Sequence, residues 1–188
     1  TAQDLFDALQ NEDAIVTAHI GGRFADVKYA HDAKIEPSVE IHSAWGSFEW
    51  IVSDAFDANY RVGIVASSDG HKGRPGASYP GDASFGSYGG LTCHLLESLD
   101  REALFEGFRR RHHFATTGAR LFLETAIQLE STGILYHRNP NLGDVSSEPC
   151  ERAIMGDIVK TSDKDVTFEV KVDGSAPIER IEIRDGHD

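Results

Sequence analysis

The chain has 188 residues, of which 40% are hydrophobic and 26% are charged, enough for a domain of ordinary size with a buried core. Its apolar runs are only a few residues long, which excludes a membrane-spanning helix of about 20 residues. Eighteen Lys and Arg residues against 31 Asp and Glu residues give a formal net charge of −13, which disfavours phosphate backbones and anionic lipid. We therefore expect no nucleic-acid and no membrane partner, although a local basic pocket is compatible with this charge.

Two cysteines, Cys93 and Cys150, are far apart and have neither CxxC nor metal-like spacing. They indicate no disulfide framework, so we expect a reducing compartment, with the cytoplasm favoured. The first ten residues also lack the charged and apolar regions of a signal peptide.

The first 66 residues alternate between helical and strand patterns. Leu5, Phe6 and Leu9 have helical spacing behind a possible Asp4 cap. The predicted order is helix 4–9, strand 14–18, strand 38–42, helix 47–59 and strand 62–66. Continuous apolar strands between helices are typical of a parallel sheet covered on both sides, so the fold class is α/β.

A Gly-, Ser- and Pro-rich stretch over residues 67–90 is too long for a passive connection and indicates a functional loop. A strand over 90–96 and a helix capped by Asp100 follow it. From Arg120 onward the helical period disappears and apolar residues alternate, up to Ile181 and Ile183 in the last segment. We therefore divide the chain into an α/β part, 1–119, and a β-rich part, 120–188.

Polar side chains stand at the ends of three predicted strands. His19 follows the first strand, His42 closes the second, and Asp69 and His71 follow the third. Because the carboxyl ends of parallel strands open on one face of the sheet, we expect these side chains to converge there.

The triplet Asp69-Gly70-His71 predicts a metal site. Residues two apart in an extended segment point to the same side, and the glycine lets the backbone approach an ion closely. His19 could add a third ligand. The alternatives are an Asx-turn at Asp69 and, for His19, a hydrogen bond to a strand-end carbonyl.

Three further residues have two interpretations each. Glu40 lies inside a strand, where a buried carboxylate needs a partner; it either binds metal or holds loop amides or an arginine. His42 is open between the same two roles. Trp45 either covers the core or forms a wall of a substrate pocket.

Cations lie in the loops beside these residues. Arg23, Lys72 and Arg74 suit a small anionic substrate on the open face of an acidic protein, or else pair with neighbouring acids. The basic run 109–113 falls at a helix end, where cations oppose the negative end of the helix dipole.

The order of these motifs resembles the later motifs of the PHP (polymerase and histidinol phosphatase) superfamily of metal-dependent phosphoesterases. The matching stretches are the His19-Ile20-Gly21-Gly22 loop, the strand Val39-Glu40-Ile41 and the SSDGH segment at 67–71. The stretch 90–120, with its REALFEGFRRR helix and ATTGAR turn, is similar to the DUF3604 group, and so are the MGD at 155–157 and the GSAPIERIEI at 174–183.

The resemblance implies the C-terminal portion of a distorted (β/α) barrel followed by a β-rich appendage. It implies His19, Asp69 and His71 as metal ligands, with catalysis resting on the metal centre and no further catalytic residue. Two or three divalent ions, Zn, Mn or Fe, would fill the complete site. Glu40 matches a supporting acid rather than a ligand. The implied activity is hydrolysis of a small phosphorylated substrate held by neighbouring side chains: Arg23, His42, Trp45, Lys72 and Arg74.

The N-terminal HxH strand of that superfamily has no counterpart here. We therefore expect the chain to be the C-terminal part of a longer protein, whose remainder, or another chain, covers the open sheet edge. The alternative function is a non-catalytic metal-binding or scaffold module.

Overall fold

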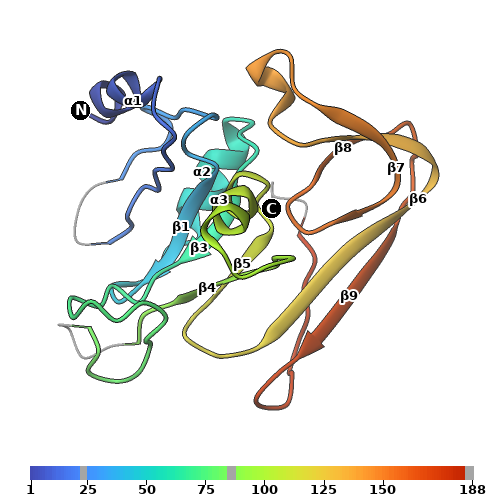
Figure 1. Cartoon of the computed structure of the whole chain (residues 1–188). Helices are drawn as coiled ribbons and strands as arrows, with labels where there is room; N and C mark the ends of the chain where they lie inside the picture. Colours follow the sequence, from blue (N-terminus) through green and yellow to red (C-terminus); the bar gives the residue numbers. More distant parts are fainter. Residues whose placement is uncertain (22–24, 84–87, 185–188) are drawn as a thin grey trace.

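The computed structural model describes residues 1–21, 25–83 and 88–184. In these ranges helices and β-sheets are mixed, which confirms an α/β composition, and the strands form no closed barrel. Figure 1 shows helices α1 to α3 and strands β1 to β5 on one side, with strands β6 to β9 beside them. None of the described helices is long and apolar enough to cross a membrane.

Helix α1 (Ala2–Leu9) forms as predicted, but its N-cap is Thr1 rather than Asp4. The Thr1 side chain accepts a hydrogen bond from the backbone of Asp4, and the Asp4 side chain bonds back to the backbone of Thr1, which makes a capping box. The helix buries Phe6 against Ala30 and Ile35.

The predicted strand over residues 14–18 is wrong, because no strand is assigned there. A strand needs a ladder of backbone hydrogen bonds, whereas this segment is tied by a bond from the Val16 amide to the Ile35 carbonyl at 2.7 Å. The segment is held by apolar contacts instead: Val16 packs beside Phe6, and Ala18 packs beside Ile20.

The central sheet has the order β2-β1-β3. Strand β1 (Ser38–Ser43) runs parallel to β3 (Gly63–Ala66), as predicted, and antiparallel to the two-residue β2 (Gly46–Ser47). The β1–β3 register shifts between Glu40 and His42, and such an irregularity bends a strand and re-aims its side chains. This shift lies where β1 carries its two candidate site residues.

Helix α2 (Trp50–Asp57) is shorter than the predicted 47–59, because Gly46 and Ser47 pair with β1. Its Ile51 and Ala55 are fully buried and pack with Val39 of β1. The helix thus covers the parallel pair with the apolar side that the sequence spacing predicted.

Strands β4 (Leu91–His94) and β5 (His113–Thr116) form an antiparallel pair rather than further parallel strands. Helix α3 (Arg101–Arg109) joins them and begins, as predicted, at Asp100, whose side chain accepts from the Ala103 amide. Backbone pairing runs from Leu91 opposite Thr116 to His94 opposite His113, so β5 lies antiparallel beside β4. The expected row of parallel strands is therefore wrong beyond β3.

The second sheet confirms the predicted β character after residue 120. The 15-residue strand β6 (Phe122–Tyr136) pairs antiparallel with β7 (Ser147–Ile154), β8 (Ile158–Lys160) and β9 (Thr167–Asp173). A 3-10 turn, η1 (Pro140–Leu142), precedes β7. The alternating segment around Ile181 and Ile183 forms no strand, and both side chains are exposed.

Charged side chains join the two parts. The Arg138 guanidinium donates to both oxygens of Glu106 in α3, at 2.9 and 2.6 Å. His112 lies 2.9 Å from Asp157 through its Nε2 atom, and Arg111 donates to the Gly156 carbonyl at 3.0 Å. The basic run at the end of α3 therefore serves mainly to hold the β-rich part.

A buried histidine makes the folded chain sensitive to acid. Burial, together with the charge of neighbouring His94, lowers the pKa of His113 from 6.5 to about 4. The unfolded chain then binds more protons than the folded chain between these values, so stability falls as the pH drops from about 6.5 towards 4. We expect His113 to account for a loss of about 2 kcal/mol between pH 7 and pH 5.

Urea unfolding at both pH values tests this effect against the His113→Gln variant, which keeps a polar group near Ser38, whose Oγ lies 2.9 Å from His113 Nε2. The variant is expected to lose about 2 kcal/mol less than the wild type over this range. Equal losses would show that His113 does not carry the acid sensitivity.

Candidate functional site

A cavity of about 310 Å³ opens beside the carboxyl ends of β1 and β3. It contains two of the predicted site residues, His19 and Glu40. Its lining consists of Thr17, His19, Glu40, Val65, Ala66, Ser67, Thr92 and Phe108. An apolar hollow with a few convergent polar groups is the usual form of a ligand site, so the candidate site is built from here.

Glu40 is the centre of the polar groups. Glu40 lies in β1 and is only 4% exposed, and its carboxylate accepts a hydrogen bond from the Ile20 amide at 2.6 Å. His19 Nδ1 lies 2.8 Å from the same oxygen, and the Ser67 hydroxyl donates to the other. Glu40 thus holds a loop amide and the His19 ring. Of the two roles considered from sequence, metal ligand or support for loop amides, these contacts correspond to support.

His19 is brought to the site by Glu40 and not by a strand end. Because the carboxylate only accepts, Nδ1 carries a proton, and the neutral form of the ring then has its lone pair on Nε2. Nε2 lies 3.9 Å from Asp69 Oδ2. Metal bonds to nitrogen and oxygen are about 2.0–2.2 Å long, so two ligand atoms of one ion lie at most about 4.4 Å apart. The His19–Asp69 pair is within that reach.

Asp69 has a constrained backbone and an unpaired oxygen. Its φ of +55° lies in the left-handed region, which aspartate and asparagine adopt more readily than other non-glycine residues. Its Oδ2 atom is buried without a hydrogen-bond partner, whereas the Ser68 hydroxyl accepts the Gly70 amide at 3.3 Å. The turn is therefore closed by Ser68, and Asp69 Oδ2 is left to bind something else.

His71 contacts the backbone of Asp69 rather than its carboxylate. It is exposed, and its Nδ1 donates to the Asp69 carbonyl at 2.8 Å. That bond leaves Nε2 as the accepting nitrogen of the neutral ring. Among the described side chains, no three His, Cys, Asp or Glu residues are assembled as a complete metal site. The role of His19, Asp69 and His71 as ligands stays a prediction.

No sequence pattern pointed to Asp82, which the fold brings to the same turn. An isolated bridge pairs Ala83 with Gly70, and Asp82 is only 3% exposed. Neither of its carboxylate oxygens has a hydrogen-bond partner among the described residues. A Cβ placed on Gly70 would meet Asp82 Oδ2 at 2.6 Å, so the carboxylate lies directly against the turn after Asp69.

His42 and Trp45 are not among the described residues that line this cavity. His42 is buried, its Nδ1 lies 2.7 Å from the Ser47 hydroxyl, and its Nε2 has no hydrogen-bond partner. Trp45 is 46% exposed and packs against Gly21, where φ is +91° and a Cβ would overlap the tryptophan Cβ at 2.2 Å. Trp45 is thus neither fully buried nor fully exposed, and its role in substrate binding stays a prediction.

Two of the predicted substrate cations, Lys72 and Arg74, are exposed, and neither is tied to an acid among the described residues. Lys72 Nζ donates to the Gly81 carbonyl at 3.0 Å, and Arg74 donates to the Tyr79 hydroxyl at 2.9 Å. Neither has an ion pair with a described carboxylate, so the alternative of pairing with neighbouring acids is not what the structure shows for these two. Arg23 lies outside the described residues.

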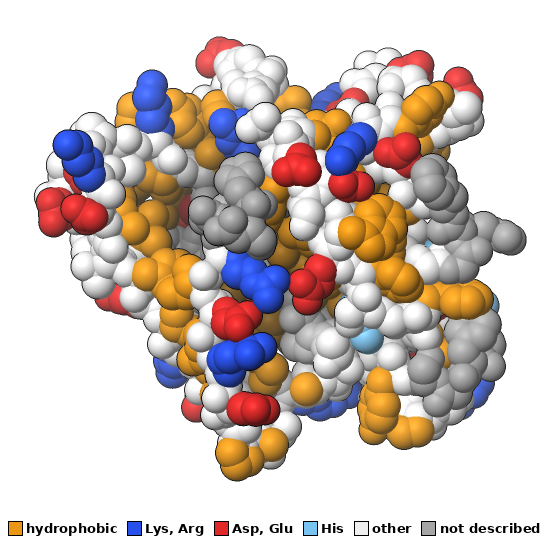
Figure 2. Space-filling view, turned by 180° about the vertical axis from the view of Figure 1, so that it is seen from behind, with side chains coloured by type: hydrophobic (Ala, Val, Ile, Leu, Met, Phe, Trp, Pro, Cys, Tyr) orange, Lys and Arg blue, Asp and Glu red, His pale blue; other side chains and the backbone are white. Residues whose placement is uncertain are grey.

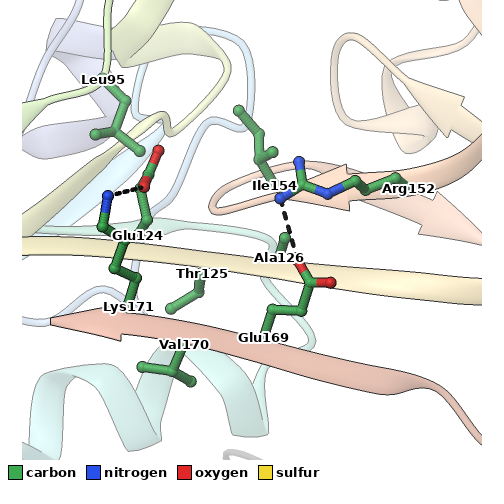
Figure 3. A pocket seen from close by; sticks show the side chains of 9 residues that line it. All are labelled: Leu95, Glu124, Thr125, Ala126, Arg152, Ile154, Glu169, Val170 and Lys171. Carbon is green, nitrogen blue, oxygen red and sulfur yellow. Dashed lines mark hydrogen bonds and ion pairs between the residues drawn. The ribbon is translucent and has the colours of Figure 1, made fainter.

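A second cavity, of about 300 Å³, lies on the sheet of the β-rich part and is shown in Figure 3. Its charged side chains pair with each other: Lys171 with Glu124 at 3.7 Å and Arg152 with Glu169 at 3.3 Å. Figure 2 shows one face of the molecule, on which basic and acidic side chains are interspersed. Paired charges of this kind support a sheet surface and leave no group aimed at a ligand, so the cavity by His19 is the better candidate.

Comparisons with protein-family models, with curated proteins and with solved structures gave no match to this chain.

Proposed function

We propose that this chain contributes metal ligands to a metal-dependent hydrolase of the phosphoesterase type, related to the PHP superfamily and its DUF3604 group. The observation that carries the proposal is the His19–Asp69 pair: a ring nitrogen held by Glu40 and a buried, unpartnered carboxylate oxygen 3.9 Å away. An imidazole nitrogen and a carboxylate oxygen at this spacing are donor atoms that suit Zn, Mn or Fe.

His19 and Asp69 would hold the ion, and Glu40 would fix the ring that presents Nε2. Bound divalent ions supply a water that loses a proton near neutral pH and stabilise charge on the phosphoryl oxygens. Lys72 and Arg74, both exposed on the loop after Asp69, are placed to attract an anionic substrate. The apolar wall of Val65, Ala66 and Phe108 would limit access of bulk water.

The second candidate function is a non-catalytic module, in which the β-rich part does the recognition. The observation that favours it is that the β-rich part forms a four-stranded sheet of its own. Metal content separates the two functions, because only the hydrolase requires bound ions.

The test is elemental analysis of the full-length protein together with hydrolysis of a generic aryl phosphate. We expect two or three divalent ions per chain, loss of hydrolysis after chelation, and recovery on adding Mn²⁺ or Zn²⁺. A protein that holds no divalent ion and does not hydrolyse the phosphate after metal addition would support the module instead.

A further inference from the structure

Asp82 is the most isolated buried charge in the part of the chain described. The residue is only 3% exposed, and both of its carboxylate oxygens lack a hydrogen-bond partner among the described residues. A buried carboxylate without hydrogen bonds is strongly unfavourable unless a proton donor or a cation compensates it. No described Lys, Arg or His lies within ion-pair distance of Asp82, although Lys72 reaches the neighbouring Gly81 carbonyl.

The position of Asp82 indicates what compensates it. The carboxylate faces the Gly70 α-carbon, in a space that a side chain on Gly70 would fill. Asp69, the preceding residue, has its own buried and unpartnered Oδ2. Two acidic residues with buried oxygens that lack described hydrogen-bond partners therefore lie at one turn, one preceding Gly70 and the other packed against it.

We propose that Asp82 binds a divalent cation against the Asp69–Gly70 turn, sharing it with Asp69, while water supplies the remaining ligands. Two carboxylates completed by water form a common site for hard divalent ions such as Mn²⁺ and Mg²⁺, which explains why a complete set of three protein ligands is not required. This inference rests on the proposed function and adds to it an oxygen-rich ligand that the motif Asp69-Gly70-His71 does not contain.

The experiment is titration of the metal-free, full-length protein with MnCl₂, with free Mn²⁺ measured by electron paramagnetic resonance. Asp82→Asn keeps the shape of the side chain and removes its charge. We expect at least a ~10-fold weaker affinity for one Mn²⁺, since even groups that only support metal ligands change affinity by 10–100-fold. The control is Asp165→Asn, an exposed aspartate with the same change of charge, which should leave the affinity unchanged.

A melting curve without metal separates binding from folding. Removing an unpaired buried charge should not lower the melting temperature of the metal-free protein, whereas the increase caused by Mn²⁺ should shrink. If Asp82→Asn fails to fold, Gly70→Ala serves instead: its Cβ would press on Asp82 Oδ2 and should also weaken Mn²⁺ binding.

The outcomes are distinct. Mn²⁺ binding that is unchanged in Asp82→Asn, or in Gly70→Ala where the first variant does not fold, would overturn the role of Asp82 and leave the proposed function standing. A wild-type protein that binds neither Mn²⁺ nor Zn²⁺ would overturn the proposed function itself.

Discussion

Replacing Asp69 with asparagine is expected to lower both the metal content and the rate of phosphoester hydrolysis of the full-length protein, the rate by at least ~100-fold. The change removes an anionic oxygen that is buried, unpartnered and 3.9 Å from His19 Nε2. A neutral amide binds a divalent ion more weakly than a carboxylate, so the two losses should appear together. Elemental analysis and steady-state hydrolysis of an aryl phosphate measure them.

The variant is suited to this test because asparagine tolerates the backbone at residue 69. The φ of +55° there would strain most side chains, but asparagine visits the left-handed region as readily as aspartate does. The melting temperature of the metal-free variant should therefore stay close to that of the wild type. Asp165→Asn, exposed on the β-rich part, controls for the change in net charge.

Unchanged hydrolysis with unchanged metal content in Asp69→Asn would show that Asp69 is not a metal ligand. Lost metal with retained hydrolysis would show that the reaction depends on other residues. In either case the short distance between His19 and Asp69 would need another explanation.

The sequence predicted those elements of the fold whose pattern is local. Strands 38–42 and 62–66, helix α3 with its Asp100 cap, and the β character after residue 120 follow from side-chain periodicity and capping, and all are present. The segment 14–18 has the same apolar pattern as a strand but finds no strand beside it among the described residues. A strand exists only with a partner, and the sequence of the segment does not contain that information.

The candidate site likewise combines residues that sequence patterns predicted with contacts that they did not. Placement of His19 near Asp69 was expected from strand ends, yet what brings His19 there is its contact with Glu40, 21 residues away. Asp82 could not be predicted, because its neighbour Gly70 is reached through an isolated bridge across a 12-residue loop with no periodic pattern. Contacts that depend on how a glycine-rich loop folds back are the ones that sequence patterns miss.

Gly156 is the point where the β-rich part presses most closely on the α/β part. Its φ is +89°, and a Cβ added there would lie 2.1 Å from the carbonyl oxygen of Arg111. Arg111 in turn donates to the Gly156 carbonyl at 3.0 Å, and its own φ is +59°. Two backbones in unusual conformations therefore meet here without a side chain between them.

The Gly156→Ala variant is expected to lose about 2–6 kcal/mol of unfolding free energy, from about 1–3 kcal/mol of backbone strain and about 1–3 kcal/mol of overlap with Arg111. Gly143→Ala is the matched control: its φ is +101°, but a Cβ there meets nothing within 4 Å, so only the strain applies. Urea unfolding of both variants gives the difference, about 1–3 kcal/mol, as the cost of the overlap alone. Equal losses in the two variants would mean that the contact between Gly156 and Arg111 yields without cost and does not fix the β-rich part in place.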